Sequence, residues 1–159
     1  MRRSLATNSL VLICDHTQSI YRNRWGNEVF HYMGIGLQGD QDLVHGQNRT
    51  LAEIPVNGVS AFLFERYERG TYTYIGEVEP AGPPYQETQK DRKGRMRKVW
   101  VFPLQLRGGG SPPPVPAAVL DEKRKAQERV AARLPLEKLT GKVKEGEGIR
   151  GIHRVSTQV

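Results

Sequence analysis

The chain has 159 residues, and 37% of them are hydrophobic, so it has room for one globular domain with an appendage and is not a disordered polymer. A formal net charge of +7 leaves two interpretations open. The chain is either a generic basic protein or one that binds a polyanion through clustered cations. A single cysteine, Cys14, excludes a disulfide framework and a cysteine-rich zinc site, and is typical of a cytoplasmic protein. No apolar run approaches the roughly 18 residues of a membrane span.

Strand patterns dominate the first 107 residues. Continuous or alternating apolar runs predict strands at 9–14, 29–33, 59–64, 71–78 and 98–106. Pro103 indicates that the last of these is an edge strand or ends early. Residues 91–94 predict the turn of a basic hairpin that leads into this strand, and residues 48–53 form the best helical segment, followed by Pro55.

The composition changes after residue 107. Residues 108–116 are rich in glycine and then in proline, which is typical of a linker. Residues 117–134 predict a charged helix with a weak apolar stripe, and Pro135 ends it. We therefore expect a domain at 1–107, a linker at 108–116, and a charged helix with a basic connecting tail at 117–159.

Residues 21–53 combine the residue types of a nucleic-acid site. Aromatic residues come first, then a glycine-rich loop, and then polar side chains. They are Tyr21, Trp25, Tyr32, Gly34, Gly36, Gly39, Asp40, Gln41, Asn48 and Arg49. Glycines let a backbone approach a ligand, aromatic rings stack on bases, and amides read base edges. The residues alone also fit an ordinary strand, loop and helix with turn glycines.

Cations are concentrated at residues 90–98, where six of nine residues are Lys or Arg. Lys93, Arg95 and Arg97 are the candidates for phosphate contacts, and a plain solvated hairpin is the alternative. Three more arginines lie around the aromatic block and are either phosphate contacts or members of surface ion pairs. They are Arg22, Arg24 and Arg49.

No catalytic or metal-binding pattern stands out. His16, His31, His45 and His153 are scattered without the spacing of metal ligands, and His45 is interpreted as a loop residue. Paired carboxylates and an activated nucleophile are also missing. We expect no catalytic residue, no metal and no cofactor.

Several short motifs follow one another in a characteristic order. They are SLVL at 9–12, HYMGIG at 31–36, DQ at 40–41, NRTLA at 48–52, YERGTYTYIGEV at 67–78 and KVWVFPL at 98–104. With these motifs, residues 8–107 resemble the SRA (SET- and RING-associated, or YDG) domain, most closely that of ScoMcrA-type HNH restriction endonucleases. The resemblance implies an α+β, PUA-like fold: a curved, partly closed antiparallel β-barrel with short flanking helices, followed here by a C-terminal helix.

The resemblance also implies a function. SRA domains bind double-stranded DNA that carries 5-methylcytosine or a related base such as 5-hydroxymethylcytosine, and they flip that base into a pocket. Tyr21 and Tyr32 match the two aromatics that sandwich the base, although a buried core role with a satisfied hydroxyl is the alternative for both. Asn23 stands where the family has an aspartate that accepts a hydrogen bond from the cytosine amino group.

The rest of the implied site surrounds this sandwich. Met33 replaces the threonine of the family and is a candidate to line the space around the 5-substituent. Backbone groups of Gly34 and Gly36 complete the pocket. Leu37 and Gln38 are candidates to fill the vacated stack, and their loop is too short to imply discrimination for CpG or hemimethylated sites. The remaining candidate DNA contacts on this block are Gln41 and Asn48.

By resemblance, the chain is the recognition module of a type IV-like, modification-dependent bacterial endonuclease. The HNH nuclease domain would follow Val159, so this chain alone is expected to bind DNA without cutting it. The alternatives are a PUA-like RNA-binding module and an enzyme that acts on the flipped base. The missing metal set and nucleophile argue against the enzyme.

Overall fold

The computed structural model describes residues 1–17, 21–122, 124–126, 128–129 and 132. The chain divides into two units, Met1–Pro113 and Pro114–Val159. In the second unit, the described residues from 117 to 132 are helical, as the sequence predicts. The rest of the predicted helix and the tail from residue 140 lie outside the described residues. Within the described part of the chain, no helix is long and apolar enough to cross a membrane.

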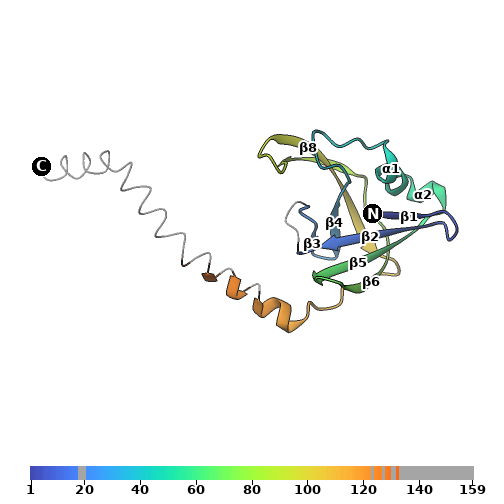
Figure 1. Cartoon of the computed structure of the whole chain (residues 1–159). Helices are drawn as coiled ribbons and strands as arrows, with labels where there is room; N and C mark the ends of the chain where they lie inside the picture. Colours follow the sequence, from blue (N-terminus) through green and yellow to red (C-terminus); the bar gives the residue numbers. More distant parts are fainter. Residues whose placement is uncertain (18–20, 123, 127, 130–131, 133–159) are drawn as a thin grey trace, which may run out of the picture. The chain divides into compact units, whose positions relative to one another are not determined.

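The first unit is built on one curved sheet (Figure 1). The strand order is β1-β2-β5-β6-β8-β4-β3, and β7 pairs with β8. The strands are β1 (Arg2–Ser4), β2 (Ser9–Asp15), β3 (Arg24–Gly26), β4 (Val29–Met33), β5 (Ser60–Glu68), β6 (Thr71–Pro80), β7 (Tyr85–Lys90) and β8 (Met96–Leu106). The helices α1 (Gly46–Ala52) and α2 (Ile54–Asn57) lie between β4 and β5 in the chain.

Apolar alternation along the strands builds the core. Leu10, Leu12, Phe30, Leu63 and Leu104 are fully buried on the inner face, and burying each such side chain stabilises the fold by about 1.5–3 kcal/mol. A second, smaller cluster forms where β4, β7 and β8 meet. It consists of Met33, Val99 and Val101, with Tyr21 and Tyr85 packed against it.

All five predicted strands are present, but the sheet is mixed rather than purely antiparallel. The pair β2–β5 is parallel, in register from Ser9 opposite Ser60 to Asp15 opposite Arg66. A parallel pair needs a long crossover, and β3, β4 and both helices lie in it. The described strands run as an open path from β1 to β3, so closure into a barrel is not confirmed.

Pro103 does not mark an edge or an early end, so that prediction is wrong. It lies inside β8 and pairs with His31 of β4. The Pro103 carbonyl oxygen accepts a hydrogen bond from the Ala81 N–H (2.9 Å), in the connection between β6 and β7. The N–H and C=O of one strand residue point to the same side, so the N–H that Pro103 lacks would also point towards this connection. The proline therefore lies in the gap on this edge of β8, after the pairing with β7 ends and before the pairing with β6 begins.

The helical prediction is confirmed with shifted bounds. The predicted segment 48–53 overlaps α1, and Pro55 stands in the first turn of the separate helix α2, where a proline is tolerated because that N–H has no partner in the helix. Gly58 ends α2 with a left-handed φ of 68°.

Candidate nucleic-acid interface

The loop that follows β4 is held from beneath by the buried side chain of Gln41. Its Nε2 donates to the carbonyl oxygens of Gly34 (2.7 Å) and Gly36 (3.2 Å). Its Oε1 accepts from the Trp100 N–H of β8 at 2.9 Å. Gln41 was predicted to contact DNA, but in this structure its amide is buried and engaged by the protein on both sides.

Asn48 holds the same loop from α1. Its Oδ1 accepts from the Ile35 N–H (2.8 Å), and its Nδ2 donates to the carbonyl oxygens of Ile35 and Asp42 (3.0 Å each). The side chain is only 1% exposed, so Asn48, which was also predicted to contact DNA, is turned towards the protein in this structure. A Cβ at Gly34 would lie 2.8 Å from the Asn48 Oδ1 and 2.9 Å from the Gln41 Oε1. Only glycine fits between the two amides.

Arg97 completes this support. It is 3% exposed, and its Nη1 donates to the carbonyl oxygens of Gly36 (2.6 Å) and Gly39 (3.4 Å). Arg97 was predicted to contact phosphate, but in this structure its guanidinium faces the protein. We call Gln41, Asn48 and Arg97 the loop clamp. The clamp binds backbone groups alone, which leaves the tip of the loop exposed: Leu37 is 44% exposed and Gln38 is also exposed.

The predicted basic hairpin is confirmed, with β7 and β8 as its arms. The Asp91 carboxylate shapes its turn by accepting from the backbone N–H groups of Lys93 (2.8 Å) and Arg95 (2.9 Å). Hydrogen bonds from these two amides, that of Arg95 first, lower the pKa of Asp91. With the carboxylate turned inward, the exposed cations of the turn point outward.

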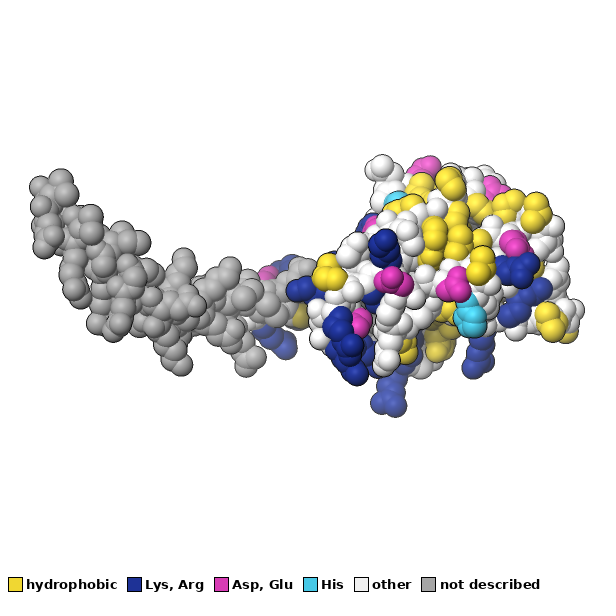
Figure 2. All heavy atoms as spheres, turned by 90° about the horizontal axis from the view of Figure 1, so that it is seen from above, with side chains coloured by type: hydrophobic (Ala, Val, Ile, Leu, Met, Phe, Trp, Pro, Cys, Tyr) yellow, Lys and Arg dark blue, Asp and Glu magenta, His cyan; other side chains and the backbone are white. Residues whose placement is uncertain are grey.

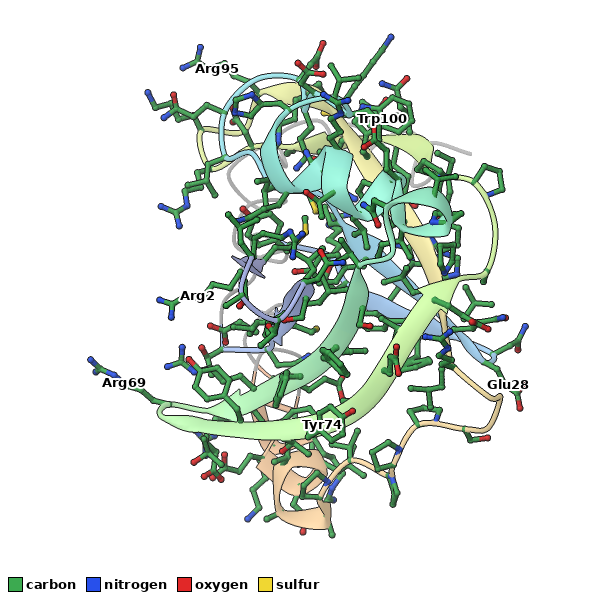
Figure 3. All side chains as sticks on the ribbon, turned by 90° about the vertical axis from the view of Figure 1, so that its right-hand side faces the viewer. Arg2, Glu28, Arg69, Tyr74, Arg95 and Trp100 are labelled. Carbon is green, nitrogen blue, oxygen red and sulfur yellow. The ribbon has the colours of Figure 1, made fainter. Side chains whose placement is uncertain are left out.

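The structure brings the loop tip and the hairpin turn together. A notch of about 110 Å³ lies between them, lined by Leu37, Gln38, Asp91, Arg92 and Lys93. The loop tip and the hairpin turn, two predicted DNA-binding groups whose notch residues are 53 or more positions apart in the chain (91 − 38 = 53), thus share one surface. In Figure 3, Arg95 projects from this turn towards the same side as Arg69, at the β5–β6 turn, and Arg2. Cations are spread along the rim of the face in Figure 2 rather than gathered in one patch.

The three flanking arginines are all exposed. Arg24 pairs with Glu87 (2.6 Å), and Arg49 pairs with Glu53 one helical turn away (2.8 Å). Hydrogen bonding to each carboxylate raises the pKa of its arginine. Such surface pairs are weak, so a phosphate could displace either carboxylate. Among the described residues, Arg22 forms no such ion pair.

The two predicted base-stacking tyrosines lie in different surroundings. Tyr32 is 3% exposed within the main core, and its hydroxyl donates to the Ile13 carbonyl oxygen at 3.3 Å. Burial raises the pKa of Tyr32 far above its usual range. These contacts fit the core role that the sequence left open, and Tyr32 would need to be uncovered to stack on a base. Tyr21 is half-buried against the smaller cluster.

Asn23 and Met33 meet at the edge of that smaller cluster. The Asn23 Oδ1 accepts from the Met33 N–H at 2.7 Å. Asn23 therefore ties the Tyr21 segment to the end of β4, a positioning contact that the sequence did not predict. Met33 itself is buried.

One polar cluster was missed. Cys14, His16, Glu65 and Tyr67 meet at the ends of β2 and β5, with the His16 and Tyr67 rings stacked 4.6 Å apart. The signal in the sequence was a C-x-H pair at a strand end, but its acidic partner is 49 residues away and only the parallel pairing of β2 with β5 brings it in.

Comparison with known families decides the identity of the fold. The family described as "ScoMcrA-like, SRA domain" matches residues 3–128, well over half of the chain. The chain belongs to the ScoMcrA-like SRA domain family. An SRA domain is a DNA-binding module and not a catalytic one. No curated protein matches the chain.

Solved SRA structures are similar to this SRA domain. The sulfur-binding and SRA domains of ScoMcrA, complexed with phosphorothioated DNA, align with 19% identity and a TM-score of 0.50 over 70% of this chain and 34% of that one. The SUVH5 SRA domain with fully methylated CG DNA aligns with 22% identity and a TM-score of 0.49 over 65% and 67% of the two chains. The likeness to ScoMcrA supports the SRA fold, and this chain spans about a third of that relative.

Two larger hollows of this SRA domain lie elsewhere. One of about 600 Å³ lies between α2 and β6, and another of about 480 Å³ is lined mainly by prolines and alanines around Pro80 and Pro103. Neither hollow is lined by a residue of the predicted site. We therefore place the candidate interface of the SRA domain at the loop tip and the basic hairpin.

Proposed function

We propose that this SRA domain binds double-stranded DNA carrying 5-methylcytosine or a related modified cytosine, and that it flips the modified base out of the stack. Family membership supports the proposal. Complexes of its structural neighbours support the DNA-binding part: ScoMcrA is solved with phosphorothioated DNA, whose modification lies in the backbone, and SUVH5 with methylated DNA. The parent protein would be a type IV-like HNH endonuclease, joined to this domain through the linker at 108–116.

The observation that carries the proposal is the notch between the loop tip and the basic hairpin. Cations at the hairpin turn neutralise backbone phosphates and position the duplex, which is independent of sequence. Leu37 and Gln38 stand beside them, on a backbone that the loop clamp holds in place. A flipped base leaves a gap in the stack, and a rigidly held tip with an exposed apolar side chain is suited to fill it.

The base itself would be held at the other end of the same loop. Tyr21 supplies a ring face, because it is only half-buried. Asn23 is fixed by the amide of Met33, which belongs to the small cluster against which Tyr21 packs, and an amide can both accept and donate to a base edge. Backbone groups of Gly34 and Gly36 would complete the pocket, with Tyr32 as the second ring once it is uncovered.

The phosphate part of the proposal is tested by charge removal at the hairpin. The double variant Lys93→Ala, Arg95→Ala should bind modified and unmodified duplexes with similarly reduced affinity, and should lower the slope of log affinity against log salt by one to two, at about 0.9 per contact. Arg107→Ala is the matched control. It follows the opposite end of β8, about 35 Å away at 3.3 Å per residue, and should change neither quantity.

The base-flipping part is tested at Tyr21. Losing a stacking ring costs about 1–3 kcal/mol, so Tyr21→Ala should weaken binding to the modified duplex by about five-fold to a hundred-fold, while Tyr21→Phe keeps most of it. The fluorescence of a 2-aminopurine placed beside the modified cytosine should rise when wild-type protein binds and should not rise with Tyr21→Ala. An unchanged preference for modified DNA in folded Tyr21→Ala would mean that Tyr21 is not part of the pocket. Tighter binding of the wild type to an RNA duplex than to modified DNA would favour an RNA-binding module instead.

The SRA domain is also expected to bind DNA without cutting it. With no nuclease domain in these 159 residues, modified plasmid should stay intact with this protein and Mg²⁺, Mn²⁺ or Ni²⁺. Reproducible nicking by the pure protein would contradict the assignment.

A further inference from the structure

The cluster at the ends of β2 and β5 contains three side chains that bind metals elsewhere in proteins. Cys14 is the last buried residue on the inner face of β2, after Leu10 and Leu12, and Glu65 continues the inner face of β5 after Leu63. Parallel pairing sets Cys14 opposite Glu65, so the two point to the same side. His16 follows two residues after Cys14, and its N–H donates to the Arg66 carbonyl oxygen (2.8 Å).

Three different ligand atoms converge there. The His16 Nε2 lies 3.5 Å from the Cys14 Sγ and 3.2 Å from the Glu65 Oε1. All three atoms lie within 4.8 Å of one another. One ring nitrogen serves both neighbours, unlike a catalytic triad, in which the nucleophile and the carboxylate use opposite ring nitrogens. A single nitrogen facing both a thiol and a carboxylate fits a common centre between the three atoms.

We propose that Cys14, His16 and Glu65 form a site for one zinc ion, with a fourth coordination position left open. Tetrahedral zinc with bonds of about 2.3 Å to sulfur and 2.0 Å to nitrogen and oxygen sets its ligand atoms about 3.5 Å (S to N) and 3.3 Å (N to O) apart. The two distances in the structure match these edges to within 0.1 Å. The third edge, between the Cys14 Sγ and the Glu65 carboxylate, is at most 4.8 Å in the structure, compared with about 3.5 Å in such a site.

The surroundings hold these ligands as the outer shell of a metal site does. The Tyr67 hydroxyl donates to the second carboxylate oxygen of Glu65, and its ring stacks on the His16 imidazole at an interplanar angle of 4°. Outer contacts of this kind fix the orientation of first ligands.

Charge and access also fit zinc. Cys14 is 2% exposed and Glu65 is 3% exposed, and two buried anions are costly without compensation. Zn²⁺ balances one thiolate and one carboxylate, and its preference for mixed S, N and O ligands matches this set. His16 is the outermost of the three, with 22% of its side chain exposed, so the open position faces the solvent side. The site does not depend on the proposed DNA-binding function.

Direct metal titration of the whole chain tests the site. The reduced protein is dialysed against a chelator and titrated with Co²⁺ and then with Zn²⁺. We expect one equivalent of Co²⁺ to give the visible absorption of tetrahedral cobalt together with a thiolate-to-cobalt charge-transfer band, and Zn²⁺ to abolish both. Zn²⁺ should also raise the melting temperature.

Ligand variants locate the ion. Cys14→Ser should lose the charge-transfer band, and His16→Asn should weaken Zn²⁺ binding by more than about ten-fold, while Tyr67→Phe weakens it by about ten-fold through the outer shell. His45→Asn, at an exposed loop histidine, is the matched control and should bind as the wild type does. Circular dichroism checks folding, and His16→Asn decides the outcome if Cys14→Ser unfolds. Absence of a stoichiometric cobalt band in the wild type, or an unchanged band in folded His16→Asn, would overturn the proposal.

Discussion

Replacing Asn48 with alanine is the sharpest test of the loop clamp. The Asn48 amide makes three buried hydrogen bonds, to the Ile35 N–H, the Ile35 carbonyl and the Asp42 carbonyl. Each is worth about 1 kcal/mol net, and a backbone group left buried without a partner costs about 1–3 kcal/mol. Water can reach part of the emptied space, so we expect Asn48→Ala to lower the free energy of unfolding by about 3 kcal/mol. That is a large share of the roughly 5–15 kcal/mol of a domain.

Asn48→Asp separates hydrogen bonding from packing. Aspartate has nearly the same shape, but it replaces the NH₂ donor with an oxygen that faces two carbonyl oxygens at 3.0 Å. We expect this variant to be at least as unstable as Asn48→Ala at neutral pH, because the buried carboxylate would keep the Ile35 N–H as a donor but set its other oxygen against two carbonyl oxygens. If Asn48 only filled space, Asn48→Asp would be nearly neutral.

Urea unfolding without DNA measures both variants, and Gln38→Ala on the exposed tip serves as the control, with a change within about 0.5 kcal/mol. A loss of less than about 0.5 kcal/mol for Asn48→Ala at unchanged m-value would refute the clamp. Asn48 would then be free to contact DNA, as the sequence suggested.

Three further changes test other parts of the structure. Gly34→Ala places a methyl group within 3 Å of both clamp amides and should cost about 1–3 kcal/mol, seen as a lower melting temperature; an unchanged melting temperature would mean that the loop yields freely. Tyr32→Phe loses one long hydrogen bond to Ile13 and should cost about 1 kcal/mol in urea unfolding, with the preference for modified DNA retained; loss of that preference would give the hydroxyl a direct role. Arg24→Ala breaks an exposed pair with Glu87 and should cost less than about 1 kcal/mol, which a larger measured loss would contradict.

Periodic features of the fold were predictable from the sequence because they depend on neighbouring residues. The runs at 9–14 and 98–106 contain enough apolar residues to identify β2 and β8. Strands β1 and β3 have three residues each, too few to show an alternation. The parallel pairing of β2 with β5 depends on the path of the whole crossover, which no local pattern records.

The candidate site shows a different limit. An amide in a glycine-rich loop can read a base edge or bind the backbone, and both uses require the same residue type. Gln41 and Asn48 bind the backbone because the loop after β4 contains N–H and C=O groups that no strand or helix satisfies. Arg95 lies in the exposed turn just before β8, whereas Arg97 lies inside β8 and is buried. The residues that stay exposed, at the hairpin turn and the loop tip, are those for which the sequence prediction stands.

The loop clamp has a consequence for how this domain could change over evolution or in the laboratory. Gln41, Asn48 and Arg97 grip the loop only through carbonyl and N–H groups, and every residue type supplies those. Leu37 and Gln38 can therefore be exchanged without disturbing what holds the backbone. A library randomised at these two positions should yield mostly folded proteins, and it would let the preference for neighbouring bases drift while stability stays constant.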